Sequence, residues 1–184
     1  MSDRALPVQQ VTAPEERTRI QLSICLATYN RGGFIGETLD PILPQLRPGM
    51  ELLVVDGASP DNTEEVMSGY LRKHPEIRYF RETVNSGVDR DYDKAVGYAR
   101  GEYCWLMTDD DLLNEGALAS VLDALIDGPD LVVVNSELKT VDLSKVLTAS
   151  IMDRSGSELY ERADAEKFFV EMTNHLSFIG SVVI

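Results

Sequence analysis

The stretch that decides the fold is GEYCWLMTDDD, residues 101–111. Its central residues, 103–107, are all apolar, which is typical of a strand buried on both faces of a sheet. Three aspartates, residues 109–111, follow this run after a single threonine. In open α/β sheets, ligands bind beyond the carboxyl ends of the strands. We therefore expect a ligand site where this strand ends.

Strands and helices alternate on either side of this stretch. Pro41 and Pro44 should make the first helix short or kinked, and Ser59-Pro60 is a favourable N-cap and first-turn pair for the second. This alternation predicts an α/β fold with a mainly parallel central sheet and helices on both faces. We expect further strands at residues 20–27, 51–55, 77–80 and 131–134. We expect helices at residues 34–46, 59–71, 91–99 and 115–126.

The pattern weakens after Asn135. Residues 136–162 are polar and mixed, which indicates an irregular excursion or a hairpin. A helix is expected at residues 163–172 and a last strand at 178–184. The apolar face of that helix should hold Phe168, Phe169 and Met172.

The chain divides into two parts. Residues 1–19 are polar and contain two prolines, which predicts a flexible leader, and residues 20–184 predict one domain. Since termini usually lie exposed, a final apolar strand indicates the N-terminal portion of a longer protein.

Composition excludes several classes of protein. The 184 residues include 17 basic and 31 acidic side chains, a net charge of −14, which argues against a nucleic-acid-binding domain. Cys25 and Cys104 lie in apolar runs, which predicts two buried, reduced thiols. No apolar run approaches the roughly 18 residues that a transmembrane segment needs. We expect a cytoplasmic protein, and leave open both its oligomeric state and peripheral contact with the inner face of the membrane.

The three aspartates are the strongest candidate site. In an extended segment Asp109 and Asp111 share one face while Asp110 points elsewhere. Mg²⁺ and Mn²⁺ prefer oxygen ligands, and are often held by one or two carboxylates together with substrate phosphates. The alternative is that Asp110 or Asp111 caps the next helix while the others are solvated. The position after a buried strand favours a metal site.

Other polar residues follow neighbouring strands. Asp56 can accept a hydrogen bond from a base imide or a sugar hydroxyl, or serve only as a turn residue before Gly57. Asn30 and Asn85 are turn-formers more often than ligand contacts.

Together these motifs resemble the family 2 glycosyltransferases. SICLATYNR (residues 23–31) is similar to the opening strand of that family, and ELLVVDGASPDNT (residues 51–63) to its second strand and turn. Residues 101–111 resemble its Gly-Glu-Tyr strand and Asp-x-Asp metal motif. The resemblance covers about residues 20–135, with 178–184 as a further match, and is greatest to the branch of abequosyltransferases and other O-antigen sugar transferases.

The resemblance implies an inverting transferase of the GT-A fold, a Rossmann-like three-layer sandwich, that uses a nucleotide-diphospho-sugar donor and a saccharide or lipid-linked acceptor. Mg²⁺ or Mn²⁺ and the diphosphate would bind at residues 109–111. The pathway would be bacterial-type surface polysaccharide synthesis. The donor-binding residues that match the family are Ala27, Thr28, Tyr29, Asn30, Asp56, Asn85, Asp93 and Asp109.

This sequence also departs from the family pattern. Ala27 stands where proline is usual, and Tyr92-Asp93 stands where many relatives carry Arg-Asn. Thr108 takes the place of the first metal-binding aspartate in one alignment, so all three aspartates remain candidates. The family's catalytic base comes from the acceptor-binding half, after the strand matched by residues 178–184. No residue of this chain is therefore assigned that role.

Two other functions compete with this one, and a third is excluded. A nucleotide-sugar-binding module without catalysis is the main alternative, since the acceptor-binding half is not matched. A nucleotidyltransferase would open with a Gly-rich loop carrying Arg, of which Arg31-Gly32-Gly33 is a weak example. A response regulator or phosphatase needs an aspartate just after the first strand, where residues 28–30 read Thr-Tyr-Asn.

Overall fold

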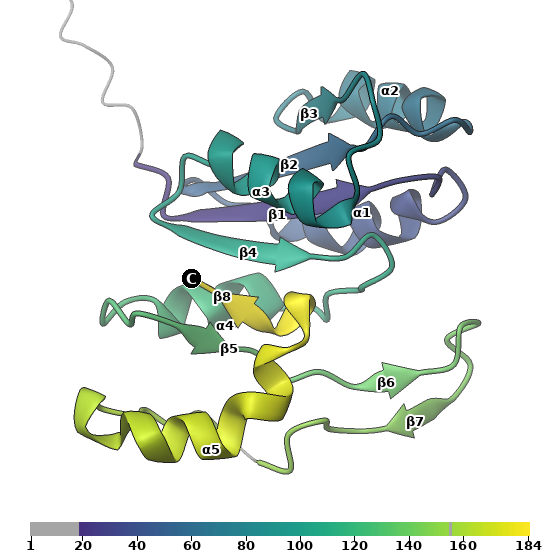
Figure 1. Ribbon diagram of the computed structural model, residues 1–184. Coiled ribbons are helices and arrows are strands. Elements are labelled where there is room, and N and C mark those ends of the chain that lie inside the picture. The colour runs from purple at the N-terminus through teal and green to yellow at the C-terminus, as the bar shows by residue number, and fades with distance from the viewer. Residues whose placement is uncertain (1–18, 155) are drawn as a thin grey trace, which may run out of the picture.

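Six strands form the central sheet, in the order β3-β2-β1-β4-β8-β5 (Figure 1). The computed structural model describes residues 19–154 and 156–184, so the expected leader lies outside the described residues except for Arg19. Strands β1 to β4 are mutually parallel, and β8 runs antiparallel between β4 and β5, so the expected mainly parallel sheet is confirmed. The strands are β1 (Leu22–Thr28), β2 (Met50–Asp56), β3 (Arg78–Arg81), β4 (Tyr103–Met107), β5 (Val132–Val133) and β8 (Val182–Val183).

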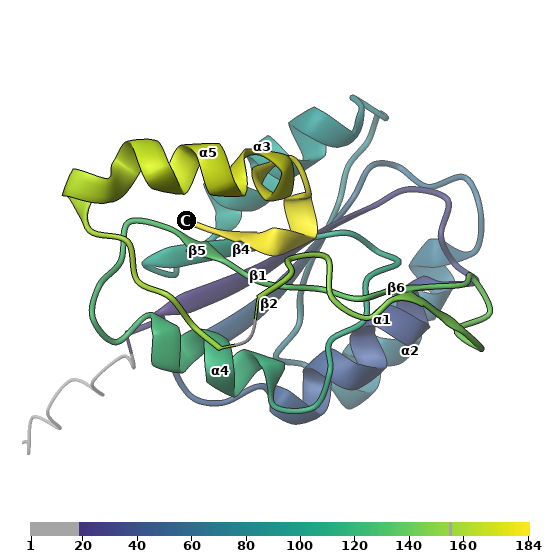
Figure 2. The same cartoon turned by 90° about the horizontal axis from the view of Figure 1, so that it is seen from below.

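Helices cover both faces of this sheet, which gives the expected three layers (Figure 2). Side chains alternate along β1, so that Leu22, Ile24 and Leu26 enter the larger core and Cys25 enters the smaller one. The helices against the larger core are α1 (Ile35–Ile42), α2 (Thr63–Lys73) and α4 (Ala117–Ala124). The helices on the opposite face are α3 (Val88–Tyr98), which covers the smaller core, and α5 (Ala165–Leu176).

Of two predictions about the first helices, one is confirmed and one is wrong. Helix α1 is short, as expected, because Pro41 lies inside it and a 3-10 turn, Leu43–Gln45, follows. The predicted start of α2 at Ser59 is wrong, since α2 begins at Thr63. The reason is that Ser59 is used in the preceding loop, where its hydroxyl accepts the backbone N–H of Asn30 at 2.9 Å.

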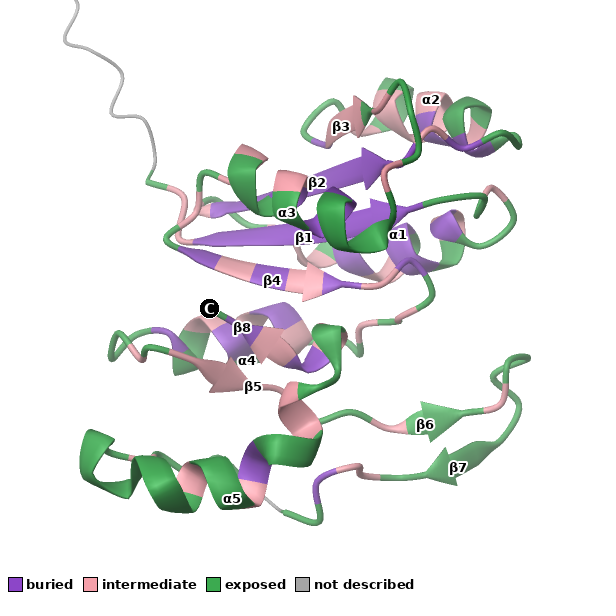
Figure 3. Cartoon of the chain, viewed as in Figure 1, coloured by how far each residue is buried: buried purple, intermediate pink, exposed green. Residues whose placement is uncertain are grey.

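Strand β4 is not buried on both faces, which corrects the expectation for residues 103–107. Tyr103, Trp105 and Met107 are buried, whereas Cys104 and Leu106 are only half-buried (Figure 3). The latter two pack on the edge of the smaller core beneath α3. The strand expected at residues 131–134 is also less buried than expected. It forms as β5, which has only two residues, both half-buried. Of the two free cysteines, only Cys25 is fully buried.

Residues 136–162 contain a hairpin, one of the two arrangements expected there. Its strands are β6 (Leu138–Lys139) and β7 (Val146–Thr148), and they pair antiparallel. The last expected strand is a 3-10 turn, Ile179–Ser181, followed by the short strand β8.

Helix α5 forms, but its expected apolar face is largely exposed (Figure 3). Met172 is buried, Phe168 packs edge-on against Tyr160, and Phe169 is 61% exposed. Across the described residues, no helix has the length and apolar character to cross a membrane. The expected cytoplasmic location stays a prediction.

Candidate functional site

A cleft of about 340 Å³ opens at the carboxyl edge of the sheet, where β1 and β4 end. Its walls come from three segments far apart in the sequence: the end of β1 and its loop, the first turns of α3, and the turn after β4. The lining residues are Ala27, Thr28, Tyr29, Arg31, Asn85, Gly87, Val88, Asp91, Tyr92, Thr108, Asp109 and Asp110. The cleft lies at the edge of the sheet where the sequence led us to expect a ligand site.

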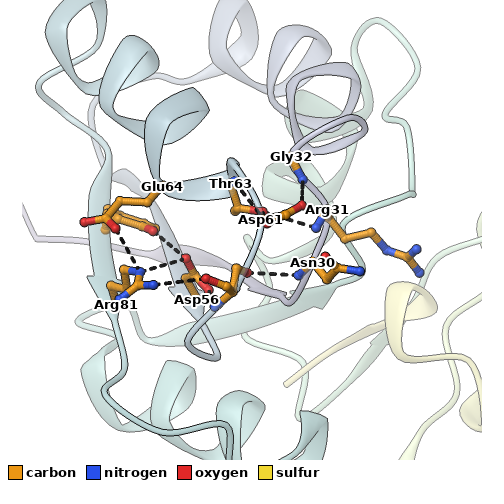
Figure 4. A network of polar contacts seen from close by, with 10 residues as sticks. Asn30, Arg31, Gly32, Asp56, Asp61, Thr63, Glu64 and Arg81 are labelled. Carbon is orange, nitrogen blue, oxygen red and sulfur yellow. Dashed lines mark hydrogen bonds and ion pairs between the residues drawn. The ribbon is translucent and has the colours of Figure 1, made fainter.

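The loop after β1 is held by the loop after β2 (Figure 4). Besides the bond from Asn30 to Ser59, the backbone N–H of Arg31 donates to Thr63 Oγ1 at 3.2 Å, and that of Gly32 donates to Asp61 Oδ2 at 2.9 Å. Asn30 takes a left-handed φ of 59° and does not line the cleft. Asn30 instead anchors the loop next to residues 27–29, and those three residues line the cleft.

Asp56 lies behind this loop and is fully buried. Its Oδ1 accepts the backbone N–H of Ser59 at 2.8 Å, and its Oδ2 accepts the hydroxyl of Tyr79 at 2.6 Å. Arg81 lies 3.7 Å from Oδ2 and also pairs with Glu64 at 3.3 Å (Figure 4). Burial, and then the neighbouring Asp56 carboxylate, raise the pKa of Tyr79, which keeps its hydroxyl a donor. Asp56 does not line the cleft.

The three aspartates after β4 point to different partners. Asp109 is 8% exposed and lies 3.3 Å from the guanidinium of Arg31. Burial raises the pKa of Asp109, and the neighbouring Thr28 hydroxyl and Arg31 guanidinium partly offset that shift. Asp110 accepts the hydroxyl of Thr108 at 2.6 Å, and Asp111 accepts the Thr108 backbone N–H at 3.4 Å.

The expected common face for Asp109 and Asp111 is wrong, because the chain turns at residues 109–110 instead of staying extended. The side chain of Asp111 points away from the cleft and toward Gly180, where its Oδ2 would lie 2.4 Å from an added Cβ. Asp109 and Asp110 both line the cleft.

The donor atoms that face the cleft suit a hard divalent cation. Of the three carboxylates that line it, Asp109 and Asp110 follow β4, across from Thr28 at the end of β1. The buried Oγ1 of Thr28 makes no hydrogen bond of normal geometry among the described residues. No three His, Cys, Asp or Glu side chains within residues 19–154 and 156–184 form a group able to hold a metal ion on their own. This set fits a cation that shares its coordination with substrate phosphates, which is how Mg²⁺ is commonly bound. The metal role of Asp109, Asp110 and Asp111 stays a prediction.

The wall formed by α3 holds Asp91 and Tyr92, neither of which was among the expected donor-binding residues. Asp91 and Tyr92 are buried and line the cleft, and the hydroxyl of Tyr92 donates to the Met107 carbonyl at 3.0 Å. Asn85 lines the cleft, and its Oδ1 accepts the backbone N–H of Gly87 at 2.9 Å. Asp93 is exposed and lies outside the cleft. Residues 88, 91, 92 and 95 recur at helical spacing, and this pattern could have identified the wall of the cleft. We expected the helix to begin at residue 91, so the prediction missed its first turn.

A mainly parallel sheet with a polar cleft at its carboxyl edge is the arrangement of the GT-A glycosyltransferase fold. The chain matches the family described as "Glycosyl transferase family 2" over residues 23–180, and it belongs to that family. It is 32% identical over 128 residues to the abequosyltransferase RfbV of Salmonella typhimurium, a match covering 68% of this chain and 38% of RfbV.

Two solved structures share the fold. The structure of residues 1–349 of TarS from S. aureus superposes with a TM-score of 0.61 and 26% identity, covering 76% of this chain and 42% of TarS. A mannosyltransferase from Pyrobaculum calidifontis, in complex with GDP-Man and Mn²⁺, superposes with a TM-score of 0.56 and 28% identity, covering 71% of this chain and 39% of that one. TarS has also been solved in complex with UDP-GlcNAc. The chain thus spans less than half the length of each of these relatives.

Proposed function

We propose that this chain binds the donor of an inverting, metal-assisted glycosyltransferase. The enzyme would move a sugar from a nucleotide-diphospho-sugar to a saccharide or lipid-linked acceptor in bacterial-type surface polysaccharide synthesis. The observation that carries this proposal is the cleft, which combines two carboxylates with the end of β1 in a chain of family 2.

Each wall of the cleft suits a different part of the donor. Asp109 and Asp110 would hold Mg²⁺ or Mn²⁺ and, through it, the diphosphate. Residues 27–29 and Asn85 would line the nucleoside. The known complexes of TarS with UDP-GlcNAc and of the mannosyltransferase with GDP-Man and Mn²⁺ support this assignment.

The chemical step is a displacement at the anomeric carbon. A base takes the proton of the acceptor hydroxyl, the acceptor oxygen bonds to the anomeric carbon, and the bond to the diphosphate oxygen breaks. A bound divalent cation would supply charge neutralisation for the departing diphosphate. Arg31, 3.3 Å from Asp109, fixes the orientation of that carboxylate before the donor arrives.

We also propose that residues 20–184 form the nucleotide-sugar-binding portion, and that the acceptor-binding portion and the base lie outside these residues. The share of each relative that the chain spans, 38% of RfbV and 42% of TarS, supports this division. These 184 residues alone should therefore bind donor and transfer sugar poorly.

A thermal-shift panel of UDP, GDP, CDP and dTDP, each with and without Mn²⁺, tests the proposal. A ligand that binds only the folded state adds about 2.7 kcal/mol of stability at a hundredfold excess over its Kd. We expect a manganese-dependent rise in melting temperature for one nucleotide. Asp109→Asn/Asp110→Asn should remove that rise, and Asp123→Asn/Asp127→Asn, an equal loss of charge at exposed residues outside the cleft, should keep it. No rise with any nucleotide would contradict donor binding.

A further inference from the structure

Asp91 is a carboxylate buried in the wall of the cleft, with one oxygen bonded and one free. It lies in the first turn of α3 and is 2% exposed. Its Oδ1 accepts the hydroxyl of Ser86 at 3.3 Å and lies 3.7 Å from the ammonium of Lys94. Within residues 19–154 and 156–184, no hydrogen bond or ion pair reaches Oδ2. Asp91 lines the cleft, so this oxygen is open to the cleft rather than sealed in the interior. A carboxylate oxygen that has no partner in the protein and faces a binding cleft is available to accept a hydrogen bond from a ligand.

The nearby cation is already engaged elsewhere. Lys94 lies 2.7 Å from Glu82 Oε2 and donates to Ser86 Oγ at 3.1 Å. Its longer contact with Asp91 lowers the cost of the buried charge and leaves the second oxygen of Asp91 free for a ligand.

Asp56 offers a direct comparison. It is fully buried, both of its oxygens are bonded inside the protein, and it does not line the cleft. Asp91 lines the cleft and keeps one oxygen free. Of these two buried carboxylates, Asp91 is therefore the one a ligand in the cleft can reach.

The position of Asp91 identifies which part of the ligand it meets. Its Oδ2 would lie 2.3 Å from a Cβ added at Gly57, the residue that follows β2. Asp109 and Asp110 follow β4, on the opposite side of β1 in the sheet order. Phosphates held by a cation at those residues would therefore lie away from Asp91, whose negative charge repels them. What remains for Asp91 is a neutral N–H or O–H group at the other end of the donor.

We propose that Asp91 is a specificity-determining residue that accepts a hydrogen bond from the nucleoside of the donor, from either the imide N–H of the base or a ribose hydroxyl. This inference rests on the proposed function. An acceptor placed at the ring N–H of the base selects uracil and thymine, which have an imide N–H, and guanine, which has a lactam N–H, over cytosine and adenine, whose corresponding ring nitrogens carry no hydrogen. Gly57 is needed for this arrangement, because a side chain at residue 57 would occupy the position of the Asp91 carboxylate.

Titration calorimetry with UDP, GDP, CDP, dTDP and ADP in the presence of Mn²⁺ tests this proposal. The measured quantity is the ratio between the affinity of the best nucleotide and that of the others, which cancels effects common to every diphosphate. Asp91→Asn should reduce that ratio or the best affinity by about tenfold or more, as expected for the loss of a hydrogen bond to a charged group. The matched control Asp89→Asn removes the same charge from an exposed position in the first turn of α3, outside the cleft, and should leave the ratio unchanged.

Nucleotide analogues can be tested on the unaltered chain, so this second test does not depend on whether the variant folds. The analogues also distinguish a hydrogen bond from the base from a hydrogen bond from the ribose. The N-methylated imide form of the best nucleotide should bind about tenfold or more weakly if Asp91 meets the base, and the 2′-deoxy or 3′-deoxy form if it meets the ribose. Full affinity for all three analogues, or an unchanged ratio together with an unchanged best affinity in a folded Asp91→Asn variant, would overturn the role of Asp91 while donor binding stands. If the unaltered chain binds no nucleotide, the proposed function fails instead.

Discussion

The hydroxyl of Tyr79 donates to the fully buried carboxylate of Asp56 at 2.6 Å. This bond holds the loop after β2, and that loop supports the loop after β1. Asp56 in turn accepts the N–H of Ser59, whose hydroxyl accepts the N–H of Asn30. A contact between the ends of β3 and β2 thus determines how residues 27–29 are presented to the cleft.

Tyr79→Phe should destabilise the fold by about 1–3 kcal/mol, because it leaves one oxygen of a buried carboxylate without its hydroxyl donor. Urea unfolding measures this change. The matched control Tyr29→Phe removes a hydroxyl from a side chain that is 44% exposed, and should change stability by less than about 0.5 kcal/mol. Equal stabilities for the two variants would show that the bond to Asp56 contributes nothing.

Gly57→Ala should lower both stability and nucleotide affinity. The added Cβ would lie 2.3 Å from Asp91 Oδ2, so the carboxylate must move, and overpacking of this kind costs about 1–3 kcal/mol. Gly97→Ala is the control within α3, since a Cβ there meets nothing within 4 Å. It should leave binding unchanged and raise stability by about 0.5–1 kcal/mol. Melting curves with and without nucleotide measure both effects, and unaltered binding in Gly57→Ala would contradict the close packing.

Asp109→Asn should stabilise the ligand-free protein at neutral pH while abolishing the nucleotide response that depends on Mn²⁺. Because burial raises the pKa of Asp109, the folded chain keeps a proton there at pH values where the unfolded chain has lost it. Stability therefore falls as pH rises through the folded pKa, and removing the ionised carboxylate restores it.

Melting temperatures of Asp109→Asn and the unaltered chain, measured from pH 4 to 8, should be closest at the acidic end and diverge as Asp109 ionises. Asp111→Asn is the comparison, since Asp111 lies outside the cleft and bonds the Thr108 N–H. It should keep the response to nucleotide and Mn²⁺. If Asp111→Asn rather than Asp109→Asn removes that response, the choice of Asp109 and Asp110 as ligands is wrong.

The parallel part of the fold could be predicted because β1, β2 and β4 are marked by apolar runs that end in polar turns. The C-terminal part could not be predicted as well. Strand β8 is two residues long, and its place between β4 and β5 depends on tertiary packing rather than on periodicity. The exposure of Phe169 likewise follows from where α5 lies, which no local pattern encodes.

The site was predictable where it depends on strand ends, as for Thr28 and Asp109. It was not predictable where it depends on which oxygen is already bonded. From the sequence, Asp56 is the proposed acceptor and Asp91 is not considered, and only the packing of Tyr79 and Ser59 around Asp56 shows that its oxygens are already bonded.

Trp105→Phe should loosen β8 selectively. The indole N–H of Trp105 donates to the carbonyl of the half-buried Gly180 at 2.9 Å, just before β8, and loss of such a hydrogen bond costs about 1 kcal/mol. Hydrogen exchange should become faster at the N–H of Ile184, which bonds the Cys104 carbonyl, and at that of Val134, which bonds Ser181. Tyr103→Phe removes a comparable bond from β4, to the Pro129 carbonyl, and should leave the Ile184 amide protected. Equal acceleration in both variants would mean that β8 is held by the sheet as a whole and not by Trp105.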